Sequence, residues 1–564
     1  MIEQQKFEQI KVCLDQDDYE NAITLLESCI EESPEELTYY WYLGLAYLLQ
    51  ESEDLAQEIW LSVFLQGNLE EVKRWTFELT GFLEIYVQEN ITTRKLGNAK
   101  VIYDAITVIN PDYENPQLLH QLIESLSNFA STLSYEKEKE SAIEVYLEIL
   151  RLNPDNVESW NSLALNYYCL DLYSEAEDSI QKSISLDSSS AESYHLLGLI
   201  LEKSKRFSDA IETYLQAIKR DPKFIYSYNS LGGLYMETNQ TERAVEIFYK
   251  ALGASSPSNQ VQAFDNLGSA YKLLGNQEKS VFNLGYSAYL DGRYKVAIDY
   301  FEECLSICSS NIEAHIALVR SYILTDQASF AISSIEKALS IFPDNLNLKR
   351  VNVSILPIIY KDLEEVEFYR FRFCQLLTKL IDETQLTHLE EKEEALNSLN
   401  FVTNFYLGYQ GYNDLDIHSQ YGLYSHKIIK SIYPQLCQLP ARRLFVENRK
   451  IRIGYLSSRL HTLGKIYLGW LKNHDRNKFE IYVYDISGHE ENVKVPFIEF
   501  RDNFKVYSDH FKIISGYIND IYISITSDNL DILVFPDIGL DPQINQLYYL
   551  RLASIQCTSW GSPM

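Results

Sequence analysis

Hydrophobic and small residues recur with a period of about 34 residues in the first part of the chain. Gly198 lies in ESYHLLGLIL, and Gly232 lies one period later in YSYNSLGGLY. Within each period, large residues at positions 4, 7 and 11 form one helix face, and a small residue at position 8 lets the next helix approach. A second small residue at position 20 marks a second helix, which a proline at position 32 ends. The pattern predicts consecutive pairs of packed helices.

The same frame fits most of the first 345 residues. Copies begin at Val157, Ala191, Ile225 and Ile312, weaker ones at Glu3, Leu37 and Ile123, and a degenerate copy surrounds residues 99–111. This spacing is that of the tetratricopeptide repeat, and repeated matches at one period predict a superhelix of such repeats over residues 1–345.

One interval breaks the period. The pairs Leu267-Gly268 and Leu284-Gly285 are separated by only half a repeat. We therefore expect an irregular half repeat near residues 278–290, where one helix replaces a normal second helix. The superhelix is predicted to change direction there.

Beyond residue 450 the periodicity changes to short β-branched runs separated by helical stretches. Strands are predicted within residues 451–458, 479–487, 504–508, 531–539 and 553–561. Strands that alternate with helices indicate a parallel, Rossmann-like sheet. Ligands lie at the carboxyl ends of such strands, so residues 457–464, 536–541 and 558–563 are expected on the functional rim.

Residues 346–450 form the junction between the two patterns. A helix pair entered through Pro357 is expected within residues 353–381, with the acidic run DLEEVEF capping its second helix. From the residues alone, this segment is a helical cap on the end of the array. The predicted fold class is therefore mainly α: a tetratricopeptide superhelix, a helical connector, and a partial α/β Rossmann-like domain over residues 451–564.

Composition and charge narrow the function classes. The net charge is −31, and residues 451–564 contribute only −2 of it, so the acidic field lies over the first 450 residues. This argues against nucleic-acid binding, which needs clustered Lys and Arg, and favours basic or neutral protein partners. Solubility of a long helical array explains the charge equally well.

Cysteine usage and targeting signals point to the cytoplasm. The eight cysteines contain no C-x-x-C pair, so buried free thiols in a reducing compartment fit better than zinc or disulfides. The N-terminus lacks an apolar signal core, and no run approaches the ~20 apolar residues of a membrane span.

Four blocks in the C-terminal part resemble a known enzyme family. RKIRIGYLSS, NHDRNKFEIYVYDIS, DILVFPDIGLDP and LRLASIQCTSWGSP resemble, in order, blocks of glycosyltransferase family 41. The run NFYLGYQGYND at residues 404–414 resembles the connector of bacterial SPINDLY-type O-GlcNAc transferase homologues. The resemblance implies the N-terminal half of a GT-B type domain. It also implies inverting transfer of a sugar from UDP-GlcNAc, or GDP-fucose in relatives, to Ser or Thr without a metal or other cofactor.

The resemblance also implies site residues. The H-x-x-G-like loop after the first strand reads His461-Thr462-Leu463-Gly464, which makes His461 a candidate base for the acceptor hydroxyl. The alternative is a loop histidine with an ordinary structural hydrogen bond. The expected cleft rim comprises Gly454, Ser457, Ser458, Gly464, Asp537, Trp560, Gly561 and Pro563.

In the eukaryotic O-GlcNAc transferases that this architecture resembles, an asparagine ladder at repeat position 6 holds the backbone of the substrate. Here that position is Asn266 and Asn283 in two repeats. Other repeats carry Ser162, Leu196, Ser230 and Ala317 there, so most of the ladder is absent. A protein or peptide acceptor on the concave face is still the expected partner.

Two departures from the family leave the activity open. Ser562 stands where the family has His or Tyr, and the family's second Rossmann-like half, which contacts the donor, would follow Met564. We expect residues 451–564 to be a truncated half-domain that is inactive alone. The alternatives are a non-catalytic tetratricopeptide scaffold, or a chain that pairs with a separately encoded C-terminal half.

Overall fold

The computed structural model describes residues 2–254, 260–399, 405–438, 449–486, 503–536 and 542–558. The chain divides into two compact units, Met1–Ser230 and Leu231–Met564. Each unit is described by itself. Among the helices of the described residues, none combines the length and hydropathy that a membrane span requires.

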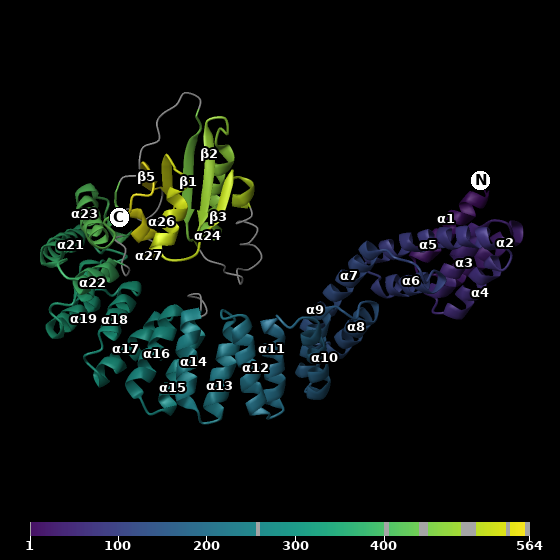
Figure 1. The fold of residues 1–564 in the computed structure, drawn as a ribbon, viewed down its shortest axis with the longest axis horizontal. Coiled ribbons are helices and arrows are strands. Elements are labelled where there is room, and N and C mark those ends of the chain that lie inside the picture. The colour runs from purple at the N-terminus through teal and green to yellow at the C-terminus, as the bar shows by residue number, and fades with distance from the viewer. Residues whose placement is uncertain are drawn as a thin grey trace. The chain divides into compact units, whose positions relative to one another are not determined.

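The first unit consists of helices that pack in sequence against their neighbours (Figure 1). They are α1 (Ile2–Asp15), α2 (Tyr19–Glu32), α3 (Leu37–Leu49), α4 (Glu53–Phe64), α5 (Leu69–Thr92), α6 (Leu96–Ile109), α7 (Pro116–Tyr135), α8 (Lys139–Leu152), α9 (Val157–Cys169), α10 (Tyr173–Leu186), α11 (Ala191–Lys203), α12 (Phe207–Arg220) and the start of α13 (Ile225–Glu237). Several begin at a polar cap: the side chains of Asp18, Asn115, Asn156 and Ser190 each accept a hydrogen bond from a first-turn backbone N–H.

The small residue at position 8 has the predicted packing role. A Cβ added at Gly44 would lie 2.1 Å from the Trp60 ring, and one added at Gly198 would lie 2.4 Å from the Tyr214 ring. In both repeats the ring comes from the same position of the second helix. The glycine therefore makes room for a large buried aromatic side chain.

The turns within the repeats recur at the same period as the repeats themselves. Asp171, Lys205 and Asn239 each follow the first helix of a repeat, have φ near 60° and succeed one another at the repeat period. This left-handed conformation ends the helix and lets the chain reverse within a few residues.

The second unit continues with more helix pairs. These are α14 (Thr241–Ala254), α15 (Gln260–Leu273), α16 (Gln277–Leu290), α17 (Tyr294–Ile307), α18 (Ile312–Leu324) and α19 (Ala328–Ile341). The left-handed turn residues Gly275 and Gly292 are only half a period apart, so α15 and α16 both end as the first helix of a repeat ends.

Helix α16 has two packing roles. Its Leu284 would contact a Cβ added at Gly268 of α15, and its own Gly285 makes room for Phe301 of α17. Ser280 at position 20 donates a 2.8 Å hydrogen bond to the Gly268 carbonyl. Helix α16 is thus the second helix of one repeat and the first helix of the next. The irregular half repeat near residues 278–290 and the change of superhelix direction stay predictions.

The connector is helical, as expected, but its details differ. It contains α20 (Leu346–Val353), α21 (Leu363–Glu383), α22 (Leu389–Leu399), the short 3-10 helix η2 (Phe405–Gln410) and α23 (Leu415–Ile432). The expected helix pair around Pro357 is a single helix, α21, because residues 354–362 are irregular. Asp362 accepts a 2.8 Å bond from the Glu365 backbone N–H, so the acidic run does cap this helix.

The C-terminal sheet is parallel, with strand order β3-β2-β1-β4-β5. The strands are β1 (Ile451–Ser457), β2 (Phe479–Asp485), β3 (His510–Ile513), β4 (Ile532–Phe535) and β5 (Ile555–Thr558), with helices α24 (Leu460–Asn473), α26 (Ile518–Thr526) and α27 (Pro542–Tyr548). The strand predicted at residues 504–508 is wrong: residues 503–506 form a helical turn, and residues 510–513 pair with β2 instead.

Each face of the sheet has its own core. Tyr467 and Leu471 of α24 pack with Ile453, Tyr455 and Val483 on one face. The other face belongs to a larger core that joins the sheet to the connector and to the repeats from α16 onward. The chain is therefore mainly α, with tetratricopeptide-type helix pairs, a helical connector and a partial Rossmann-like sheet.

Candidate functional site

The carboxyl edge of β1 and β4 is the site that the sheet topology indicates. From β1 the chain runs outward through β2 to β3, then returns to the other side of β1 as β4 and continues to β5. The strand order reverses between β1 and β4, and such switch points leave a crevice at the carboxyl ends where ligands bind.

Ser457 ends β1 and fixes the turn that follows. Its side chain is fully buried, and its Oγ accepts a 2.9 Å hydrogen bond from the Arg459 backbone N–H. Its carbonyl accepts a 3.0 Å bond from the Ile486 N–H, which links the ends of β1 and β2. Ser458 follows at the rim and is partly exposed. Both serines therefore lie at the carboxyl end of β1. Their place on the rim of a donor cleft stays a prediction.

Gly454 lies in the middle of β1, short of that edge. A Cβ at this position would lie 2.5 Å from Leu530 Cδ1 and 3.0 Å from Tyr484 Cε2. Packing of the segment between α26 and β4 on the sheet explains this glycine, and the structure does not bring it to the rim.

His461 and Gly464 lie in a helix rather than in the predicted loop. Helix α24 begins at Leu460, directly after the short turn that ends β1, so the backbone of residues 461–464 forms its first turns. The side chains of residues 461–466 lie outside the described part of the structure, as do Asp537, Trp560, Gly561 and Pro563. The roles of these residues stay predictions.

Two residues at this edge were not singled out from the sequence. Tyr467 of α24 is buried and donates a 3.1 Å hydrogen bond to the Pro536 carbonyl, which ties the helix to the end of β4. Asp485 ends β2, and its side chain is buried as well. A polar residue that ends an apolar strand, as in FEIYVYD, was the available signal for Asp485.

The two asparagines expected on the concave face of the repeats differ. Asn283 is 3% exposed, and its Nδ2 donates a 2.7 Å bond to the Lys279 carbonyl of its own helix. Asn266 is partly exposed, and its Oδ1 accepts a 3.0 Å bond from Gln262 Nε2. Only Asn266 presents surface to a partner. Among the described residues, no group of three or more His, Cys, Asp or Glu side chains is arranged to hold a metal ion.

A half-buried histidine in the first unit also belongs to repeat packing. His195 Nδ1 lies 3.2 Å from Ser227 Oγ, and the rings of Tyr214 and Phe224 lie 5.6 and 5.4 Å from its own ring. Burial lowers the pKa of His195 to about 4, so its imidazole is neutral at physiological pH. The surrounding rings make it a packing residue.

Comparison with known families identifies the repeats. Tetratricopeptide repeat models match residues 7–66, 123–156, 191–224, 213–246 and 278–311. The matches include the copies predicted to begin at Ile123 and Ala191, and also α16 with α17 as one repeat. No curated protein shows significant similarity to the chain.

Several solved structures are similar in part. A crystal structure of MamA is 24% identical over 29% of this chain and 96% of its own, with a TM-score of 0.27. YrrB, described as a tetratricopeptide repeat protein with an unusual peptide-binding site, is 21% identical over 31% of this chain and 89% of its own, with a TM-score of 0.26. The O-GlcNAc transferase of Thermobaculum terrenum is 16% identical over 56% of this chain and 50% of its own, with a TM-score of 0.36.

Proposed function

We propose that this chain is a protein O-glycosyltransferase-like protein. In this proposal its repeats bind an acceptor protein, and its α/β domain takes part in transferring a sugar, GlcNAc, from a nucleotide sugar to Ser or Thr. The observation that carries the proposal is the switch point between β1 and β4, on a sheet that shares one core with the connector and the later repeats. Nucleotide ligands bind at such switch points.

Each of the three parts of the chain has its own role. Residues 1–345 recognise protein, residues 346–450 connect, and residues 451–564 supply one half of a GT-B type cleft. Ser457 and Ser458 lie at the cleft rim, and His461 is the base. The acceptor oxygen attacks the anomeric carbon, the bond from that carbon to the diphosphate oxygen breaks, and UDP leaves with the electron pair. The acceptor proton passes to the His461 imidazole.

The test is transfer of tritiated GlcNAc from UDP-GlcNAc to a library of Ser- and Thr-containing peptides by the chain mixed with a separately expressed second Rossmann-like half of a family 41 transferase, because residues 451–564 supply only one half of the cleft and are expected to be inactive alone. We expect labelled peptide with the natural sequence and a loss of about 100-fold or more with His461→Ala, because a general base contributes about 10²–10⁴-fold. His120→Ala, an exposed histidine on α7, is the matched control and should keep the activity.

A second candidate is a tetratricopeptide scaffold without catalysis. It is favoured by the packing of Ser457, whose hydroxyl is buried and holds the turn after β1. If neither UDP-GlcNAc nor GDP-fucose yields labelled peptide while the chain still binds peptides, the scaffold replaces the transferase proposal.

A further inference from the structure

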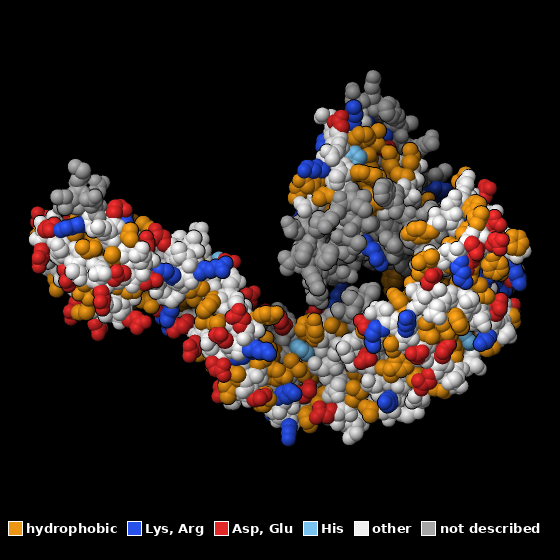
Figure 2. All heavy atoms as spheres, turned by 180° about the vertical axis from the view of Figure 1, so that it is seen from behind, with side chains coloured by type: hydrophobic (Ala, Val, Ile, Leu, Met, Phe, Trp, Pro, Cys, Tyr) orange, Lys and Arg blue, Asp and Glu red, His pale blue; other side chains and the backbone are white. Residues whose placement is uncertain are grey.

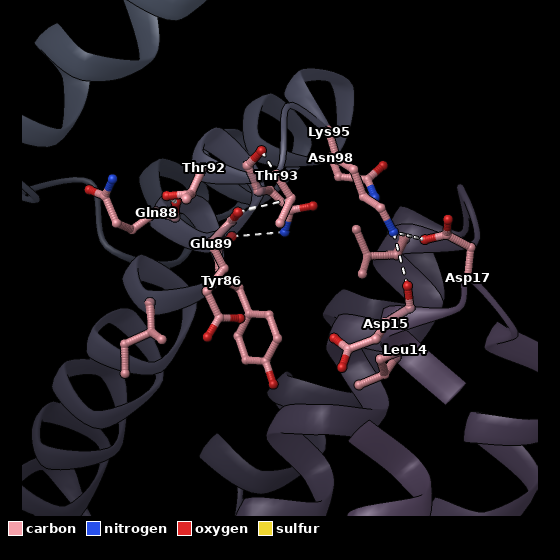
Figure 3. Close-up of a pocket in the computed structure, with 13 residues that line it drawn as sticks. Leu14, Asp15, Asp17, Tyr86, Gln88, Glu89, Thr92, Thr93, Lys95 and Asn98 are labelled. Atoms are coloured by element: carbon pink, nitrogen blue, oxygen red, sulfur yellow. Dashed lines mark hydrogen bonds and ion pairs between the residues drawn. The ribbon is translucent and has the colours of Figure 1, made fainter. Parts of the chain in front are cut away.

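A hollow lies in the first unit where three helix–helix turns come together. Its volume is about 650 Å³, and it lies between the ends of α1, α3 and α5 and the start of α6. We call it the N-terminal groove; its lining includes Leu14, Asp15, Leu49, Ile85, Glu89 and Asn98. Figure 3 shows Tyr86 and Glu89 of α5 on one side of the hollow, and Leu14 and Asp15 of α1 on the other.

The groove is held open by contacts between the first and third turns. Lys95 Nζ donates a 2.6 Å bond to Asp17 Oδ1 and a 3.2 Å bond to the Asp15 carbonyl (Figure 3). Tyr19 donates a 2.9 Å bond to Asp17 Oδ1, and Asn98 reaches the Tyr19 hydroxyl at 3.4 Å. Lys95 lowers the pKa of Asp17, so this carboxylate stays ionised and paired. The groove is thus formed before any ligand binds.

The floor and one wall of the groove are apolar. Leu14 is buried and Leu49 is half-buried, while Ile85 is 58% exposed and faces the hollow from α5. An isoleucine left so exposed beside a hollow offers contact area for an aliphatic side chain from outside.

The charges around the groove are mainly negative. Asp15 and Glu89 are exposed carboxylates on opposite sides, and neither has an ion pair among the described contacts. The Lys95 ammonium faces Asp17, so its charge is already balanced. One adjoining hollow shares Leu49 and Asn98, carries Glu51, Glu53 and Asp54, and has no Lys or Arg among its described lining residues. A second adjoining hollow is lined by Arg94 as well as by Asp17 and Lys95. Figure 2 shows Asp and Glu side chains spread over the face of the N-terminal helices that is in view.

We propose that the N-terminal groove binds a short basic segment of a partner protein. A leucine-sized side chain of that segment contacts Leu49 and Ile85, and Lys or Arg residues beside it pair with Asp15 and Glu89. Complementary charge sets the partner's chemistry, since an acidic segment would face repulsion on both sides. This inference rests on the protein-binding part of the proposed function and names a partner class for it.

The experiment measures binding of a fluorescein-labelled peptide in which lysine and leucine alternate, by fluorescence polarisation on the complete chain. The double variant Asp15→Lys with Glu89→Lys should bind about tenfold more weakly, because two attractions become repulsions. Glu124→Lys with Glu140→Lys makes the same change in net charge on α7 and α8, away from the groove, and should bind as the natural chain does. Ile85→Ser should weaken binding without altering charge. This exposed side chain can be replaced without disturbing the core.

The outcomes separate specific binding from attraction to an acidic protein. Equal weakening by the two double variants would overturn the proposal, as would tight binding of a peptide that alternates glutamate and leucine. Binding should also weaken as salt rises from about 0.05 to about 0.5 M, where charges are screened over a few ångströms. The two proposals can fail independently. If the groove does not bind the basic peptide, sugar transfer in the peptide transfer assay is unaffected, and the groove variants should transfer sugar as the natural chain does.

Discussion

At the residue scale, a glycine and an aromatic ring set the distance between the two helices of a repeat. The ring on the second helix occupies the space that a side chain would fill at the glycine on the first helix. Gly232 of α13 faces the ring of Phe248 on α14, and an added Cβ would lie 2.2 Å from Phe248 Cε1. The neighbouring Gly233 has no atom within 4 Å of its added Cβ. Two adjacent glycines in one helix therefore have different reasons to be there, and the repeat frame tells them apart because it places Gly232 at position 8.

This pair allows a matched test. Gly232→Val should lower the free energy of unfolding by about 1–3 kcal/mol, because the added side chain overlaps a fully buried ring. Gly233→Val should change it by less than about 0.5 kcal/mol, since glycine and valine are both weak helix formers. Thermal unfolding followed by circular dichroism measures both. Equal effects of the two variants would mean that the Phe248 contact does not limit the repeat.

Residue patterns also show where sequence reasoning fails. The run at residues 504–508 alternates apolar and polar positions, yet Phe504 is buried and Val506 is 71% exposed in a helical turn. So short an alternation fits a strand and a helical turn equally well. The hydrogen bonds that the edge of β2 offers decide between them, and residues 510–513 take these bonds. The sequence of either segment, taken alone, does not show which of the two pairs with β2.

At the element scale, α16 shows how an array accommodates half a repeat. The small residue at position 8 and its large partner on the next helix recur as a unit, independently of the full period. The predicted loop at residues 461–464 is wrong. It was carried over from a resemblance, whereas the short connection after β1 places these residues at the start of α24. A loop length carried over from a resemblance therefore does not show where a helix begins.

Helix α16 packs against α15 on one side and α17 on the other, so substitutions on its two sides should destabilise different neighbouring helices. Leu284→Ala removes the side chain that fills the space at Gly268, so hydrogen exchange should accelerate mainly in α15. Gly285→Val places a side chain against Phe301, 2.8 Å from its ring, so exchange should accelerate mainly in α17. Ser269→Val, at an exposed position on α15, serves as the control. If both variants loosen α15 and α17 alike, α16 packs as an ordinary second helix.

At the scale of the whole molecule, the second unit is a continuous core that crosses from repeats to connector to sheet. Phe373 of α21 and Leu533 of β4 belong to the same buried cluster, together with side chains of α16–α19. Hydrogen bonds to backbone carbonyls reinforce it: the Arg551 N–H donates a 3.0 Å bond to the Leu436 carbonyl, and the side-chain atom His426 Nδ1 lies 3.0 Å from the Tyr549 carbonyl. Periodicity predicts that each helix or strand has an apolar face. It does not predict which of these faces pack against one another.

This shared core predicts that connector and sheet unfold as one. Phe373→Ala and Leu533→Ala should each remove about 2–5 kcal/mol, because each leaves a cavity in a fully buried site. In differential scanning calorimetry both should lower the same transition, although one residue lies in a connector helix and the other in a strand. Leu122→Ala, in a separate core of the first unit, should lower a different transition. If Phe373→Ala did not lower the temperature at which the sheet unfolds, the connector and the sheet would unfold independently. The α/β domain would then be free to act independently of the repeats.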